Sequence, residues 1–180
     1  MISYIALLRG INVGGHRPLK MEDLRKMFLQ LGFKKVETYI QSGNVVFEVP
    51  ESRQTDQLVP LIKEQIEESF GYDVPVVVRS AYRLGAILNN FPFDIKEGWK
   101  GYITFLAEEP DSEAKEQLES QSNNIETFKV AGTQVYSVVN KKADQKPQFS
   151  NRFIEKQLRV AGTNRNLRTI NKVLNLASAE

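Results

Sequence analysis

The sequence predicts an α+β protein, with an N-terminal ferredoxin-like βαββαβ unit and a second, smaller α+β subdomain that ends in two helices. Three observations predict this class. Short β-rich runs alternate with amphipathic helical patterns, glycines follow the ends of the helical patterns, and Gln41-Ser42-Gly43 joins two β-rich runs in the manner of a hairpin turn. We place the subdomain boundary after residue 79, which gives segments 1–79 and 80–180.

The first segment carries six expected elements. Apolar residues three and four positions apart mark its helices, and β-branched and aromatic runs mark its strands. In order, these are a strand at 2–8, a helix between Pro18 and Gly32, strands at 36–40 and 44–49, a helix at 55–70 and a strand at 74–79. This is the order of a split βαβ unit.

The second segment repeats the alternation of helical and β-rich patterns. Its expected elements are a helix at 82–90, a strand at 102–106, a helix at 110–118, a hairpin of 125–130 with 134–139, a helix at 150–160 and a last helix after Gly162-Thr163-Asn164. A diverged copy of the first architecture would explain this pattern, although no residue-level repeat is visible.

Composition excludes several classes of function. The chain has no cysteine and a single histidine, His16, so disulfides, thiolate catalysis and sites built from cysteine or several histidines are ruled out. No cofactor is implied. The N-terminus lacks the pattern of a signal peptide, and no apolar run approaches the roughly 18 residues of a membrane span. We therefore expect a cytoplasmic protein that does not associate with membranes.

The net charge of +2 hides an uneven distribution along the chain. Residues 1–140 hold 15 Lys and Arg against 19 Asp and Glu, a balance of −4, whereas residues 141–180 hold nine against three, a balance of +6. A basic end favours anionic partners. A solvated helix face near acidic helices explains the same distribution.

Two polar loops are expected to meet in space. In a ferredoxin-like unit the first and third strands are neighbours, so the end of the first strand lies beside the start of the third. A glycine-rich backbone, an arginine and amide side chains together suit a phosphate or carboxylate. The residues that we expect to bind such a ligand in these loops are Arg9, Asn12, Gly14, Gly15, Gln41, Ser42 and Asn44. The alternative is that the glycines shape a turn and the asparagines hold it by bonds to the backbone.

A third polar cluster precedes the expected last helix. Thr163 or Asn164 would cap this helix, and Arg165 would lie beside its positive end, where an anion is favoured. Whether this cluster joins the first two is not determined by the sequence. His16 is a candidate for phosphate contact or acid–base work, but no orienting carboxylate is recognisable near it.

The chain resembles the bacterial family called domain of unknown function 1697. The resemblance covers nearly the full length. It rests on the motifs Leu8-Arg9-Gly10-Ile11-Asn12-Val13-Gly14-Gly15 and Thr38-Tyr39-Ile40-Gln41-Ser42-Gly43-Asn44-Val45-Val46-Phe47, with weaker matches at Asn90-Phe91-Pro92 and Ile103-Thr104-Phe105-Leu106. Thr163-Asn164-Arg165-Asn166 is similar to a Thr-x-Arg-Asn signature of the family, but Leu167 follows where a tryptophan is usual. The resemblance implies an α+β fold and supplies no catalytic residues, because the family has no established activity.

Three functions remain open. The first is a binding module for a small ligand that carries phosphate or carboxylate. The second is binding of RNA or single-stranded nucleic acid, with Tyr4 and Phe47 as a stacking surface and Arg152, Lys156 and Arg159 on one helix face. The third is an enzyme of unassigned type, since no pair of acid–base groups is singled out by its spacing. The sequence does not determine an oligomeric state.

Overall fold

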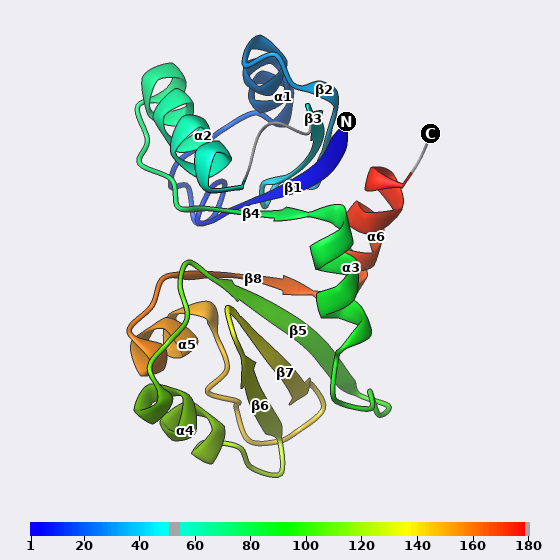
Figure 1. The fold of residues 1–180 in the computed structure, drawn as a ribbon. Coiled ribbons are helices and arrows are strands. Elements are labelled where there is room, and N and C mark those ends of the chain that lie inside the picture. The colour runs from blue at the N-terminus through cyan, green and yellow to red at the C-terminus, as the bar shows by residue number, and fades with distance from the viewer. Residues whose placement is uncertain (51–54, 179–180) are drawn as a thin grey trace. The chain divides into compact units, whose positions relative to one another are not determined.

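The computed structural model describes residues 1–50 and 55–178. It divides into two compact units, one formed by residues 1–87 with the described residues from Asn171 onward, and one formed by residues 88–170. Each unit is built around a four-stranded antiparallel sheet (Figure 1). The mixed α+β class predicted from the sequence is thereby confirmed.

The first unit contains the six predicted elements, with ends shifted by a few residues at most. They are β1 (Ile2–Leu8), α1 (Met21–Gln30), β2 (Lys34–Tyr39), β3 (Asn44–Val49), α2 (Thr55–Phe70) and β4 (Val76–Ser80), followed by α3 (Ala81–Asn89). The strand order is β2-β3-β1-β4. The predicted pairing of the first strand with the third is therefore confirmed, with Leu7 opposite Asn44 at the end of β1.

The core of this unit lies between α1, α2 and one face of the sheet. Alternation along β1 sends Tyr4, Ala6 and Leu8 to that face. The ring of Phe47 on β3 packs 4.7 Å from that of Phe33 and 6.1 Å from that of Tyr4, measured between ring centroids. Phe47 is 0% exposed and Tyr4 is 5% exposed. The prediction that these two rings form a surface for stacking bases is wrong, because both are part of the hydrophobic core.

The second unit has the same order of elements as the first. After α3 come β5 (Trp99–Leu106), α4 (Ser112–Ser120), β6 (Glu126–Ala131), β7 (Gln134–Asn140), α5 (Asn151–Leu158) and β8 (Gly162–Asn166). The last helix, α6 (Leu167–Ala177), begins in the second unit, and its residues from Asn171 onward belong to the first. The strand order is β6-β7-β5-β8, which matches β2-β3-β1-β4 element for element. In this unit, α4 and α5 cover one face of the sheet (Figure 1).

Strand β8 was not predicted, since its polar residues suggested a loop and a helix cap. It pairs with β5 in antiparallel register, with Thr163 opposite Phe105. The Asn164 amide donates to the Thr104 hydroxyl at 2.9 Å, so a polar residue on this strand has a partner on the next. The prediction that Thr163 or Asn164 caps the last helix is wrong. The Asn166 side-chain oxygen does so, accepting from the Thr169 N–H at 2.8 Å.

The likeness of the two units extends to single residues. The central strands carry Tyr4-Ile5 and Tyr102-Ile103 at matching positions, and Ile5 and Ile103 are paired with Arg79 and Arg165, respectively. In both arginines, Nη1 donates to the carbonyl of the preceding residue, at 2.9 Å in Arg79 and 2.8 Å in Arg165. Such matched positions support a diverged repeat, which the unaligned sequence had not revealed.

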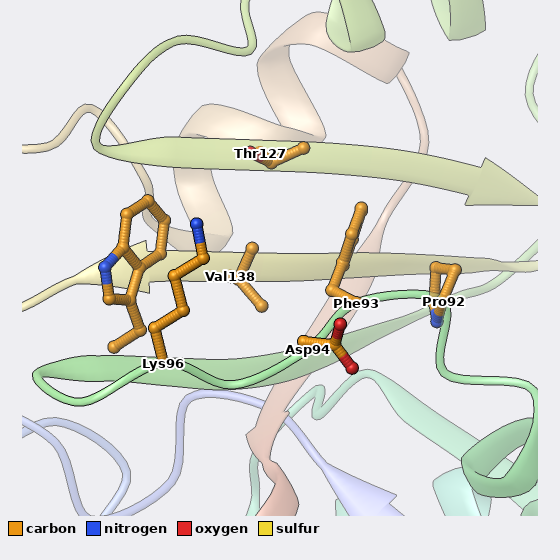
Figure 2. Close-up of a pocket in the computed structure, with 7 residues that line it drawn as sticks. Pro92, Phe93, Asp94, Lys96, Thr127 and Val138 are labelled. Carbon is orange, nitrogen blue, oxygen red and sulfur yellow. The ribbon is translucent and has the colours of Figure 1, made fainter.

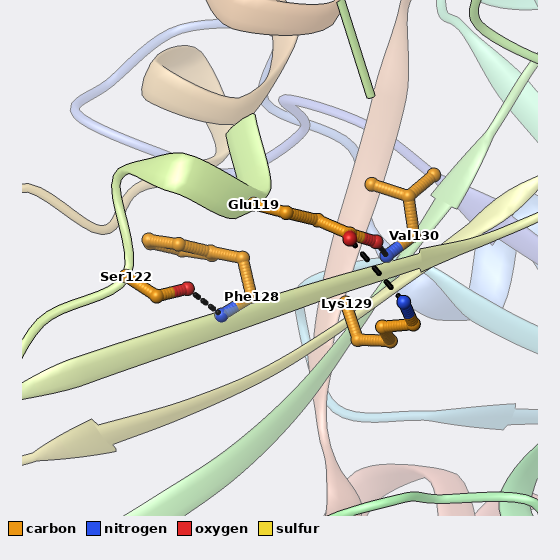
Figure 3. A network of polar contacts seen from close by, with 5 residues as sticks. All are labelled: Glu119, Ser122, Phe128, Lys129 and Val130. Atoms are coloured by element: carbon orange, nitrogen blue, oxygen red, sulfur yellow. Dashed lines mark hydrogen bonds and ion pairs between the residues drawn. The ribbon is translucent and has the colours of Figure 1, made fainter. Parts of the chain in front are cut away.

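The edge strand β6 has its outward N–H groups occupied by side chains (Figure 3). Glu119 accepts from the Val130 N–H at 2.8 Å and from the Lys129 ammonium at 3.2 Å. The Ser122 hydroxyl accepts from the Phe128 N–H at 3.0 Å. Asn123 accepts from the N–H of Glu126, the next outward group, at 3.2 Å. Three residues at the end of α4 and in the turn after it thus provide acceptors for the outward N–H groups of this edge.

Removal of the Glu119 carboxylate should destabilise the second unit. We expect Glu119→Ala to lower the free energy of unfolding by about 1 kcal/mol, because the partly buried Val130 N–H loses its acceptor. Lys129→Ala removes only an exposed ion pair and should change it by about 0.5 kcal/mol or less. Urea unfolding of the two variants measures the difference. Equal effects would show that the edge hydrogen bond contributes nothing beyond the ion pair.

Candidate functional site

The loop after β1 folds as a small hairpin over residues 12–17. The Asn12 N–H donates to the Arg17 carbonyl at 3.2 Å, and the His16 N–H donates to the Val13 carbonyl at 3.0 Å. At its tip, Gly14 and Gly15 have φ values of 58° and 76°. Two consecutive positive φ angles are typical of a type I′ turn and favour glycine. The tip of the hairpin is exposed to solvent.

The Asn12 side chain fastens this hairpin to its surroundings. Its amide nitrogen donates to the Gln41 carbonyl at 2.9 Å and to the Leu19 carbonyl at 2.8 Å, and its oxygen accepts from the Leu19 N–H at 2.8 Å. One side chain therefore joins the loop after β1, the turn before β3 and the segment that leads into α1. The predicted meeting of the two polar loops is confirmed by these contacts.

The buried side chain of Asn44 stabilises the turn before β3. The Asn44 amide donates to the Tyr39 carbonyl at 2.8 Å and to the Ser42 hydroxyl at 3.2 Å, and its side chain is 0% exposed. Gly43 has a φ of 81°, and a Cβ there would lie 2.7 Å from the Cβ of Leu8. Close approach of the turn to β1 thus requires glycine. Asn44 and Ser42 shape the turn, while Gln41 is the exposed residue.

The hairpin and the residues next to it in the chain carry basic side chains. Residues 1–21 contain Arg9, Arg17, Lys20 and His16 and no acidic residue. The Arg9 backbone N–H is bonded to the Pro75 carbonyl at 2.9 Å, which fixes where this residue leaves β1. A Cβ at Gly10 would lie 3.2 Å from Nη1 of Arg17. The Arg17 guanidinium therefore lies against the backbone of Gly10, the residue after Arg9. We call Arg9, Asn12, Gly14, Gly15, Arg17 and Gln41 the loop corner.

Arg17 was absent from the residues predicted to bind a ligand. The signal that identifies it in the sequence is the lack of acidic residues over the first 21 positions, which leaves its charge without a neighbouring carboxylate in the chain.

The third predicted cluster lies on β8 in the second unit. Arg165 is 8% exposed, and its Nη1 donates to the Thr163 hydroxyl at 2.9 Å as well as to the Asn164 carbonyl. Burial lowers the pKa of Arg165 from its ordinary value to about 10, so the group stays charged at neutral pH. Burial and, second, the charge of Arg83 also lower the pKa of Arg79, the matching residue of the first unit. Both arginines are hydrogen-bonded to the protein, and Arg165 is buried whereas Arg79 is half-buried.

A second basic feature lies at the start of α6 and was missed in the sequence. A cavity of about 480 Å³ is lined there by Lys100, Asn166 and Arg168, together with apolar residues. The two cationic residues of this cavity, Lys100 and Arg168, are far apart in the chain. They come together because β8 pairs with β5. We call Lys100 and Arg168 the α6 corner.

Some sites lack candidates in the described part of the chain. Residues 1–50 and 55–178 contain no group of three or more His, Asp or Glu residues placed to hold a metal ion. Over the same residues, none of the helices combines the length and the apolar composition that crossing a bilayer requires.

Substitution of Asn12 should loosen the loop corner. We expect Asn12→Ala to lower the free energy of unfolding by about 1–3 kcal/mol, because the Leu19 N–H and two carbonyl groups lose their partner. Asn12→Asp keeps the acceptor for Leu19 but places a carboxylate against two carbonyls, and should also destabilise. The control is Asn124→Ala at an exposed position, and thermal unfolding is the measurement. If Asn12→Ala is as stable as the control, the Asn12 hydrogen bonds do not contribute to stability.

Comparisons with known proteins agree with this fold. Residues 1–136 match the model of the family described as "Protein of unknown function (DUF1697)", and no curated protein matches the chain. Among solved structures, the chain is similar to the conserved bacterial protein SP0830 from Streptococcus pneumoniae, with a TM-score of 0.72 and 23% identity over 98% of this chain and 99% of that one. The structure of an unknown protein from Galdieria sulphuraria matches with a TM-score of 0.25 and 10% identity over 98% of this chain and 89% of that one. With most of its length matched by the family model, the chain belongs to the DUF1697 family.

Proposed function

We propose that the protein binds a small ligand bearing a phosphate or carboxylate group at the loop corner. The observation that carries the proposal is the concentration of Arg9, Arg17 and exposed glycine backbone in a loop region without acidic residues. Guanidinium groups and backbone N–H groups are the donors that proteins use most for such anions.

The second unit provides an internal reference for the length of this loop. Between β1 and α1 the chain uses residues 9–20, whereas the matching connection between β5 and α4 uses residues 107–111. The backbone bonds at the base are the same in both. Leu8 and Leu106 donate to the turn before the third strand at 2.8 and 2.9 Å, and Arg9 and Ala107 donate to the residue before the last strand at 2.9 Å. The short connection of residues 107–111 is therefore sufficient for this topology. The longer connection between β1 and α1 is not needed for the fold, which leaves its hairpin available for binding.

Each residue of the loop corner has a proposed task. Arg9 and Arg17 pair with the anion, and the N–H groups of Gly14 and Gly15 donate to it from the hairpin tip. Gln41 contributes its exposed amide to orientation, and Asn12 keeps hairpin and turn in register. Ser42 and Asn44 support the turn from within. Thr163, Asn164 and Arg165 are left with a structural task on β8, because their polar groups are bonded within the second unit.

The arrangement of each unit also supports a finer assignment of fold. We infer that both units are ferredoxin-like, because each has the element order βαββαβ and the strand order in which the first strand lies between the third and the fourth. A cytoplasmic location stays a prediction, and no reaction is assigned.

Binding should be visible as stabilisation by anionic probes. We expect inorganic phosphate, citrate or AMP to raise the melting temperature beyond the effect of chloride at equal ionic strength, because a ligand selective for the native state stabilises it. At 100 times its Kd, one such ligand contributes about 2.7 kcal/mol. Amide NMR signals of Gly14 and Gly15 should shift in the same titration. Absence of any effect from all three probes would contradict the proposal.

Arginine variants test where the anion binds. We expect Arg9→Ala and Arg17→Ala each to weaken binding by roughly tenfold or more, because a charge-assisted hydrogen bond contributes about 1.5–3 kcal/mol. One control is Arg152→Ala, which removes an exposed cation of α5. The other is the double variant Lys100→Ala with Arg168→Ala, which removes both cations of the α6 corner. Loss of binding in the double variant alone would show that the assignment to the loop corner is wrong.

A further inference from the structure

A separate cavity lies in the second unit, on the face of its sheet opposite α4 and α5. It has a volume of about 270 Å³ and includes Thr127 of β6 and Val138 of β7 in its lining. These two residues are paired across the strands, and their neighbour Phe128 faces the helix-covered core. The volume is just below the roughly 300–1,000 Å³ that is usual for small-ligand pockets, so an occupant would be small, about one ring system with a substituent.

A tight turn brings a cation and an aromatic ring to this cavity. The Trp99 N–H donates to the Lys96 carbonyl at 3.0 Å, and Gly98 between them has a φ of 82°. This is the pattern of a type II turn, which needs glycine at its third position. The Gly98 carbonyl accepts from the Lys141 N–H at 2.8 Å, so the turn is fixed to the end of β7. Lys96 and Trp99, the first and last residues of the turn, both line the cavity.

The opposite wall of the cavity is also aromatic. Phe93 packs edge-on against Phe91 with 5.8 Å between ring centroids, and Phe91 packs against Tyr136 at 5.7 Å. This chain of contacts fixes the Phe93 ring. In Figure 2, Val138 lies between the Phe93 ring and the Lys96 side chain, with Asp94 nearer the loop and Thr127 on the strand beyond.

The polar groups of the cavity are unused by the protein. Over residues 1–50 and 55–178, the side chains of Asp94, Lys96, Thr127 and Trp99 form no hydrogen bond or ion pair. The nearby Lys142 differs, since its ammonium lies 2.8 Å from the Glu97 carboxylate. An exposed ammonium, an exposed carboxylate and a half-buried hydroxyl line a pocket with aromatic walls, and a few polar groups in an otherwise apolar lining are typical of a ligand site.

We propose that this cavity binds a small molecule with a planar aromatic ring and an acidic substituent, either a carboxylate or a phosphate. The ring lies over Val138 between Phe93 and Trp99, where offset stacking or edge-to-face contact stabilises it. Lys96 pairs with the acidic group, and Asp94 or Thr127 accepts a hydrogen bond from an O–H or N–H of the ring. The site lies in the second unit and does not depend on the loop corner.

Trp99 is the single tryptophan of the chain, so its fluorescence reports on this site directly. The full-length protein is titrated with 4-hydroxybenzoate, an aromatic carboxylate, and with AMP, a mononucleotide. Phenol supplies the ring without the acid, and acetate and inorganic phosphate supply the acid without the ring. We expect a saturable change in Trp99 emission with at least one of the first two probes, at a concentration roughly tenfold or more below that needed for phenol. The probe that binds more tightly identifies the source of the acidic group.

Variants separate this site from the loop corner. Lys96→Ala should weaken binding of the ring-bearing acid about tenfold and leave phenol unaffected, because only the charged contact is lost. Lys100→Ala, next to Trp99 but on the opposite face of β5, is the matched control, and Arg9→Ala should not alter the titration. Calorimetry on Trp99→Phe, which keeps an aromatic ring, provides a readout without fluorescence. The proposal is overturned if neither acid gives a saturable change, or if Lys96→Ala binds both as tightly as the unmodified protein.

Discussion

In each unit, the first strand lies inside the sheet and must satisfy its backbone hydrogen-bonding groups on both sides, and the meeting of loops at its end follows from that requirement. β1 lies between β3 and β4, and β5 lies between β7 and β8. At the end of the central strand, consecutive N–H groups are bonded to the turn before the third strand and to the entry of the fourth. Three segments distant in sequence therefore meet at one point of each sheet. In the first unit that point carries the loop corner, and in the second it carries only a short connection.

The two units share a strand arrangement, here called the frame, and differ in the length of their loops. The matched pairs Tyr4 and Tyr102, Ile5 and Ile103, and Arg79 and Arg165 belong to the frame, where strand pairing restricts the choice of residue. Burial restricts it further at Ile5 and Ile103. Loop length is not restricted in this way, because lengthening a surface connection has a small entropic cost. The hairpin of residues 12–17 and the pocket beside Trp99 are each elaborations of one half, which explains why two different sites are proposed on one repeated architecture.

Much of the first unit could be predicted from its sequence, because helix 55–70 and strands 2–8 and 44–49 have clear periodicity and local stop signals. The meeting of Asn12 with Gln41 followed from topology alone. Burial of Asn44 did not follow, since a polar residue at a turn has the same sequence signature whether it faces ligand or backbone. β8 was missed because its polar residues are stabilised by partners on β5, 60 residues away in the case of Asn164 and Thr104. The Trp99 pocket depends on strand pairing in the same way.

The occupied edge of β6 restricts how other proteins can recognise this one. A peptide that binds by strand addition needs a row of free N–H and C=O groups on an exposed edge. At β6 the outward amides of Glu126, Phe128 and Val130 are already bonded to Asn123, Ser122 and Glu119. An incoming strand would have to displace three side chains before forming its first ladder. Partner recognition through β-augmentation is therefore disfavoured on this side of the second unit, and association there must use side chains instead.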